Sequence, residues 1–329
     1  MRFCCEVEAI IGADYLKTMP AIETFALEKT YQVGFWRKKT KLALRQLTLS
    51  VPEGEIFGYL GPNGAGKTTT LRLIMGLATP TGGSFKLLGG DINDGAIRAQ
   101  IGFLPEQPYF YDYLTPRELL RYFAALSAIP AKECTRRIEA VLKRVGLYED
   151  AWSTQLRKFS KGMLQRVGLA QAILHDPKLI VLDEPMSGLD PMGRREVRDL
   201  IEELNHEGKT IFFSTHILSD AEALCDRVAV LSRGELRGVG VVADLIGSVK
   251  GNVEIMWHGA AAVKAVQAAG FECHVIGETV RAVVPEANVD QVIDILRNSR
   301  SKLIAVTPMR TTLEDYFMAK LSAPAEVTQ

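Results

Sequence analysis

The sequence of 329 residues is poor in cysteine, carries no net charge and has no long apolar run. Its five cysteines are scattered, odd in number and without a Cys-x-x-Cys pair, which argues against a disulfide framework or a zinc site and favours a reducing compartment. A formal net charge of +0 at pH 7 supplies no overall field toward nucleic acid or anionic lipid, so we expect no nucleic-acid partner. No stretch reaches the roughly 20 consecutive apolar residues of a membrane helix, so a membrane role requires another chain.

The N-terminal segment also lacks the features of a signal peptide, because Glu6, Glu8 and Asp14 interrupt the region where an apolar core is needed. Residues before Met19 show no clear periodicity, and the patterned sequence starts soon afterwards. We therefore interpret residues 1–21 as an N-terminal extension and expect that translation starts at Met19.

From residue 22 to about 240, short apolar runs alternate with helical periods, which is typical of an α/β fold with a mostly parallel sheet. Strands covered on both faces are continuously apolar, and the run 178–185 has this character until two carboxylates interrupt it. The sequence predicts strands at 42–51, 54–60, 178–185 and 210–216, and a helix at 67–77 that ends near Gly76.

Two regions depart from this alternation. Residues 115–155 have only helical character, since 115–118 ("TPRE") form a capping box with proline at the first helical position and apolar residues follow at helical spacing. We expect a helical subdomain over about 108–165. After residue 240 the texture changes again and predicts a small α+β domain, residues 241–329. Its expected strands are 251–257, 272–277 and 280–285, and its expected helices are 261–270 and 287–299.

The segment Gly61–Thr68 fits the pattern G-x-x-x-x-G-K-[ST] in full, between a predicted strand and a predicted helix. Glycines allow positive φ and turn backbone N–H groups inward, which makes a concave anion-binding nest. The helix that begins near Lys67 adds its positive end. Lys67 is expected to reach the β- and γ-phosphates, and the Thr68 hydroxyl to ligate Mg²⁺. The segment therefore predicts a site for a nucleoside triphosphate.

A second motif follows the apolar strand 179–182. This strand brings Asp183 and Glu184 to its carboxyl end, where open α/β sheets bind ligands. Asp183 is suited to hold Mg²⁺, and Glu184 is suited to orient and polarise the attacking water. No N-K-x-D motif for guanine follows the phosphate loop. Tyr31 lies upstream at a strand-like edge, where it either stacks on adenine or packs against its neighbours.

Further motifs accompany these two. In order, the motifs are the phosphate loop, "FSKGMLQR" (159–166), "LIVLDEP" (179–185), "SGLD" (187–190), "STH" (214–216) and the terminal "VTPMRTTLEDYF" (306–317). With this order and spacing, residues 22–240 resemble a known family, the ATP-binding subunits of ABC transporters. The resemblance implies a P-loop NTPase fold of the ABC-ATPase type, with a mostly parallel sheet, an antiparallel edge subdomain and a helical insertion. The Ser-Lys-Gly-Met signature and the C-terminal extension are similar to those of exporters whose permease is a separate chain.

The resemblance also implies a role for the signature. Ser160 and Gly162, at a helix N-terminus, are expected to contact the γ-phosphate bound by the other subunit. Lys161 replaces the usual glycine and either adds positive charge near the phosphate or points to solvent. Met163 replaces the usual glutamine and cannot donate a hydrogen bond to ribose. The implied nucleotide-binding residues are Tyr31, Gly61, Pro62, Asn63, Gly64, Ala65, Gly66, Lys67, Thr68, Thr69, Glu106, Gln107, Ser160, Lys161, Gly162, Met163 and Asp190.

Three loops complete the implied site. His216 matches the switch histidine, which is expected to bind the γ-phosphate and help fix the geometry of the water that Glu184 activates. Asp190 matches the loop that crosses the dimer interface. The family's glutamine aligns with Glu106, which can still ligate Mg²⁺ through oxygen, while Gln107 comes next. The implied catalytic residues are Glu184 and His216, and the implied metal ligands are Thr68, Asp183 and Glu106.

Two further stretches keep alternatives open. Tyr109, Phe110, Tyr111 and Tyr113 either line the groove that receives the permease or pack in the core. The cluster "WRKKTK" (36–41) either contacts lipid headgroups or nucleotide, or is a solvated loop.

The resemblance thus implies an ATP-binding and ATP-hydrolysing subunit of an ABC exporter, which uses ATP and Mg²⁺ and dimerises head to tail with a second copy or a homologous ATPase. A membrane permease is expected to hold it, as a cytoplasmic protein, at the cytoplasmic face of the cell membrane. The alternative is a soluble ABC-type ATPase that acts on DNA or ribosomes. Such proteins usually carry two cassettes, a long coiled coil or zinc-binding cysteines, and none appears in this sequence. A small-molecule kinase would leave the signature, "SGLD" and "STH" motifs unexplained.

Overall fold

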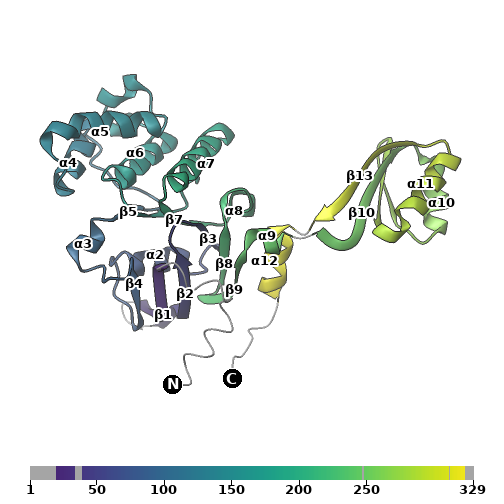
Figure 1. The fold of residues 1–329 in the computed structure, drawn as a ribbon, viewed down its shortest axis with the longest axis horizontal. Helices are drawn as coiled ribbons and strands as arrows, with labels where there is room; N and C mark the ends of the chain where they lie inside the picture. The colour runs from purple at the N-terminus through teal and green to yellow at the C-terminus, as the bar shows by residue number, and fades with distance from the viewer. Residues whose placement is uncertain (1–19, 34–38, 247, 311, 323–329) are drawn as a thin grey trace. The chain divides into compact units, whose positions relative to one another are not determined.

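The computed structural model describes residues 20–33, 39–246, 248–310 and 312–322 (Figure 1). The expected start at Met19 and the first half of the basic cluster 36–41, residues 36–38, lie outside these residues. The chain forms two compact units, of which the second is Val242–Ser322.

The first unit is built on a six-stranded sheet of order β5-β6-β7-β3-β8-β9, which is parallel except for the β8–β9 pair. Every residue of β3, β6 and β7 is buried, which explains the apolar runs at the centres of these strands. All four strands predicted for this unit are confirmed, three of them here and 42–51 within β2. The six strands are β3 (Ile56–Leu60), β5 (Ile101–Leu104), β6 (Leu179–Asp183), β7 (Thr210–Thr215), β8 (Arg227–Ser232) and β9 (Glu235–Val241).

A separate three-stranded antiparallel sheet, β2-β1-β4, supplies the edge subdomain. Its strands are β1 (Pro20–Val33), β2 (Lys39–Pro52) and β4 (Gly82–Leu87). In the β1–β2 register Tyr31 lies directly opposite Lys41. Apolar side chains of this sheet join those of β3 and the following helix in one core cluster, so the subdomain is anchored beside the phosphate loop.

The helices of this unit include the predicted helical segment between the strand-rich segments. The segment 115–155 is helical as predicted, and Thr115 and Glu118 form the expected capping box in both directions. The helices are α2 (Lys67–Ile74), α3 (Gly95–Arg98), α4 (Pro116–Leu126), α5 (Ala131–Arg144), α6 (Lys161–Ile173), α7 (Pro191–His206) and α8 (Leu218–Leu224), with short 3₁₀ turns at Glu149–Ser153 and Leu156–Lys158.

The second unit is a four-stranded antiparallel sheet of order β11-β12-β10-β13 with helices α10 and α11 against one face (Figure 1). The predicted strands and helices are confirmed, but β13 and α12 were not predicted. The elements are α9 (Val242–Leu245), β10 (Ser248–His258), a turn at Ala260–Ala262, α10 (Val263–Ala268), β11 (Cys273–Ile276), β12 (Thr279–Pro285), a turn at Glu286–Asn288, α11 (Val289–Asn298), β13 (Lys302–Arg310) and α12 (Leu313–Ser322). The predicted α/β class with an added α+β part is therefore confirmed.

Candidate functional site

The phosphate loop leaves the carboxyl end of β3 and ends where α2 begins at Lys67. Gly64 and Gly66 have φ of 80° and 113°, in the left-handed region that favours glycine. A Cβ on Gly66 would lie 2.6 Å from the carbonyl oxygen of Ala43, and one on Gly61 would lie 2.5 Å from that of Leu231. The loop therefore needs glycine for its backbone angles and for its close contact with neighbouring strands.

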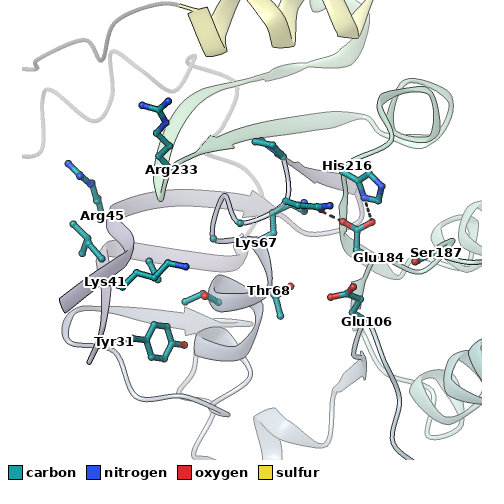
Figure 2. Close-up of a pocket in the computed structure, with 17 residues that line it drawn as sticks. Tyr31, Lys41, Arg45, Lys67, Thr68, Glu106, Glu184, Ser187, His216 and Arg233 are labelled. Atoms are coloured by element: carbon teal, nitrogen blue, oxygen red, sulfur yellow. Dashed lines mark hydrogen bonds and ion pairs between the residues drawn. The ribbon is translucent and has the colours of Figure 1, made fainter. Parts of the chain in front are cut away.

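A cavity of about 980 Å³ opens beside this loop (Figure 2). It brings together residues that are more than 180 positions apart in the sequence, because the carboxyl ends of parallel strands meet at one edge of the sheet. The predicted residues that line it are Tyr31, Pro62, Asn63, Gly64, Gly66, Lys67, Thr68, Thr69, Glu106, Glu184 and His216. Gly61 and Ala65 belong to the loop but are not among the lining residues.

At the cavity, Lys67, Glu184 and His216 form one chain of contacts (Figure 2). Lys67 Nζ lies 3.3 Å from Glu184 Oε1 and donates a hydrogen bond to the carbonyl oxygen of Gly61 at 2.7 Å. His216 Nδ1 lies 2.9 Å from Glu184 Oε2. The Lys67 and Glu184 side chains are only 6% and 9% exposed, so the ion pair is shielded from solvent. The carboxylate is thus held between a cation and an imidazole.

The backbone at Glu184 is strained. Its φ is 52°, a conformation that is uncommon for a residue with a side chain, and such angles cluster at functional sites. The Glu184 N–H donates to the carbonyl oxygen and hydroxyl of Ser214, at 3.2 and 3.1 Å. The neighbouring strand β7 therefore holds the angle that turns this carboxylate into the cavity.

Asp183 is buried one residue earlier, where the Ser214 hydroxyl donates to its Oδ1 at 2.6 Å. Burial raises the pKa of Asp183, hydrogen bonds from Ser214 and Thr68 oppose that shift, and the charges of Glu106 and Glu184 reinforce it. These oxygen donors fit a hard divalent cation such as Mg²⁺, which prefers one or two carboxylates plus phosphate oxygens. Among the described residues no group of three or more His, Cys, Asp or Glu side chains forms a metal cluster by itself.

The signature residues lie elsewhere. Ser160 is the N-cap of α6, and its hydroxyl accepts a hydrogen bond from the Met163 N–H at 3.2 Å. Lys161 Nζ lies 3.4 Å from the Ser187 hydroxyl, so its side chain is directed toward the "SGLD" turn. The four signature residues do not line the cavity of their own chain; they are Ser160, Lys161, Gly162 and Met163.

The structure also places the two remaining predicted loops, which contain Asp190 and residues 106–113. Asp190 caps α7, accepting a hydrogen bond from the Gly193 N–H at 2.8 Å. Glu106 lines the cavity, whereas Gln107 is exposed and is not among the lining residues. Tyr109, Tyr111 and Tyr113 are 91%, 56% and 59% exposed, so burial in the core is wrong for these three, and Phe110 is half-buried.

A family model, relatives from other organisms and solved structures all match this chain to the same kind of protein. The ABC transporter family model matches residues 44–187. An ABC transporter ATP-binding protein of Synechocystis is 43% identical over 310 residues, which cover 91% of this chain and 84% of that protein. This chain belongs to the ATP-binding proteins of ABC transporters.

Further relatives include the bacitracin transport ATP-binding protein BcrA of Bacillus licheniformis, 45% identical over 193 residues, which cover 58% of this chain and 62% of that protein. Among solved structures, a dimeric ATP-binding cassette in a post-hydrolysis state with ADP and phosphate has a TM-score of 0.62 and 28% identity, over 67% of this chain and 98% of that one. This chain, called the cassette from here on, is therefore the ATP-binding and ATP-hydrolysing subunit of an ABC transporter. In the described parts of the chain no helix is long and apolar enough to span a membrane.

The cassette also uses cavity residues that the motifs did not identify. Lys41, Arg45 and Arg233 line the cavity and no motif marks them, and Ser187 lines it as the first residue of the "SGLD" motif. In the sequence Lys41 stands out only as the last residue of the basic cluster 36–41. The register that places Lys41 opposite Tyr31 includes a shift at Ala43, so no simple alternation in the sequence reveals it.

Proposed function

We propose that two copies of the cassette, or one copy and a homologous ATPase, bind two ATP molecules head to tail and drive a separate exporter permease from the cytoplasmic face of the membrane. The observation that carries this proposal is the separation of the site into two parts. Lys67, Glu184 and His216 line one cavity, whereas Ser160 caps a helix whose N-terminus does not line that cavity.

A helix N-terminus with a serine cap is suited to an anion. If the γ-phosphate in one copy meets the Ser160 helix of the other, ATP contacts both copies and so favours the closed dimer. The dimer that a different ATP-binding cassette, 28% identical to this chain, forms with ADP and phosphate supports the same assembly.

Within each site the residues divide the work. Glu184 is the general base that orients and polarises the attacking water, and His216, 2.9 Å from it, binds the γ-phosphate. Lys67 exchanges its contact with Glu184 for the β- and γ-phosphates. Thr68, Asp183 and Glu106 are the candidate ligands of Mg²⁺, whose charge neutralises the phosphate oxygens.

The exporter assignment rests on the signature and the relatives. One relative is named for bacitracin transport, and the exposed tyrosines at 109, 111 and 113 offer a surface for the permease. The competing assignment, an ATPase that acts on DNA or ribosomes, has no observation in its favour among the described residues.

The test is the mass of the Glu184→Gln variant in light scattering, with and without Mg·ATP. We expect its mass to double with ATP and not with ADP, since the bound ATP is not hydrolysed. Adding Lys67→Ala should abolish the ATP-dependent dimer, and adding Ser160→Arg should abolish it while ADP binding remains. A Glu184→Gln variant that stays monomeric at saturating ATP, or an unaffected Ser160→Arg dimer, would contradict the proposal.

A further inference from the structure

Lys41 occupies a defined place on the wall of the nucleotide cavity. It lies on β2 directly opposite Tyr31 of β1, and directly opposed residues of an antiparallel pair project from the same face of the sheet. Both residues line the cavity. In Figure 2 the Lys41 ammonium is directed toward the space between Tyr31 and the phosphate loop, while the Arg45 guanidinium points away from that space.

The strand gives the position of Lys41 along the cavity. Ala43, two residues further on, touches the phosphate loop, because its carbonyl oxygen lies where a Cβ on Gly66 would clash at 2.6 Å. Lys41 precedes Ala43 by two residues, across a register shift of the β1–β2 pair that leaves Ala43 as the extra residue. Lys41 therefore lies on the strand between the loop that receives the β- and γ-phosphates and the level of the tyrosine expected to stack on adenine. The part of ATP between those two points is the ribose and the α-phosphate.

Of the four cations that line the cavity, Lys41 and Arg233 have no partner among the described residues. Lys67 pairs with Glu184, and Arg45 Nη1 pairs with Glu235 Oε1 at 3.1 Å. In the described part of the chain no ion pair or hydrogen bond engages the Lys41 ammonium. A cation that is aimed into a cavity without a counterion is suited to an anion of the ligand.

We propose that Lys41 binds the α-phosphate of the nucleotide. This inference rests on the proposed function for the location of ATP, and it adds a contact outside the family motifs. The contact is independent of the base and of the γ-phosphate. It stabilises the ground state and the transition state equally, so it acts on affinity and not on the chemical step.

The test compares Lys41→Met with Lys86→Met, a matched control on β4 of the same sheet, exposed and outside the cavity. Isothermal titration with ADP at low salt should show affinity about 3- to 10-fold weaker for Lys41→Met and unchanged for Lys86→Met, the size typical of an exposed charged contact. GDP should weaken by the same factor, and the loss should shrink in high salt. Adenosine binding should not change, and Lys41→Arg should retain ADP affinity.

Steady-state kinetics give a second readout. The KM for ATP should rise in Lys41→Met while kcat at saturating ATP stays within about twofold, as expected when uniform binding is lost. Unchanged ADP affinity, an equal loss for adenosine, or a lower kcat at constant KM would each overturn the inference. Failure of the proposed function is distinguishable, because it would appear as an absence of ATP-dependent dimers in the Glu184→Gln variant that retains Lys41. ADP binding would still report on Lys41 in that case.

Discussion

The two units of this chain bury different kinds of side chain. Every buried polar or charged side chain in the described residues lies before Val242, including Lys67, Asp183 and Glu184. The core of the second unit is made of aliphatic side chains around Trp257. Burying a charge is unfavourable unless it is paired, and a chain retains such groups where a site needs them. The comparison therefore assigns the ATP chemistry to the first unit and a core of aliphatic side chains around one tryptophan to the second.

The largest expected effect tests the chemical half of this comparison. Glu184→Gln should lower ATP turnover about 10²- to 10⁴-fold, the span typical of removing a general base, while ATP binding remains. Single-turnover hydrolysis separates the two properties, because it reports the chemical step on nucleotide that is already bound. Turnover at the unmodified rate would remove Glu184 from the mechanism and leave its strained backbone without a functional reason.

The site illustrates what local sequence can predict. The phosphate loop and the carboxylates after β6 follow from spacing alone, because a glycine pattern between strand and helix, or an apolar strand that ends in two acids, is a local property. The pairing of Lys67 with Glu184 joins residues 117 positions apart and depends on the strand order β6-β7-β3. No motif encodes that order, so this contact could not be predicted from the sequence.

The second unit shows the same limit for strands. β12 has a strict alternation of buried and partly exposed residues, and its pattern is visible in the sequence. β13 lies at the sheet edge, and its large apolar residues Leu303, Ile304 and Val306 are all partly exposed, so no clear alternation marks it. Its strand structure comes from pairing with β10, which only the fold supplies.

The next largest effect tests whether the second core is separate from the chemistry. Trp257 is fully buried on β10 between β12 and β13, so Trp257→Ala should cost about 3–5 kcal/mol of the stability of this unit. Amide exchange measured by mass spectrometry should quicken across 252–308 and not in α2, with ATP turnover within about twofold. The control is Leu182→Ala in β6, next to Asp183, which should lower both stability and turnover. If both variants lost stability and ATP turnover to the same extent, the two units would unfold together.

The smallest effect compares two buried tryptophans, one in each unit. Trp152 donates its Nε1–H to the carbonyl oxygen of Leu147 at 2.8 Å, whereas Trp257 Nε1 is buried with no hydrogen-bond partner among the described residues. Trp152→Phe removes a made bond and leaves a carbonyl unpaired, so it should cost about 1 kcal/mol more than Trp257→Phe. In Trp257→Phe the relief of an unsatisfied donor offsets the lost ring volume, and we expect a loss below about 1.5 kcal/mol. Amide exchange of the first unit in Trp152→Phe and of the second unit in Trp257→Phe, each against the unmodified chain, measures the two values. Equal costs would indicate that the Trp257 donor is satisfied in solution, because only an unpaired donor gains from its own removal.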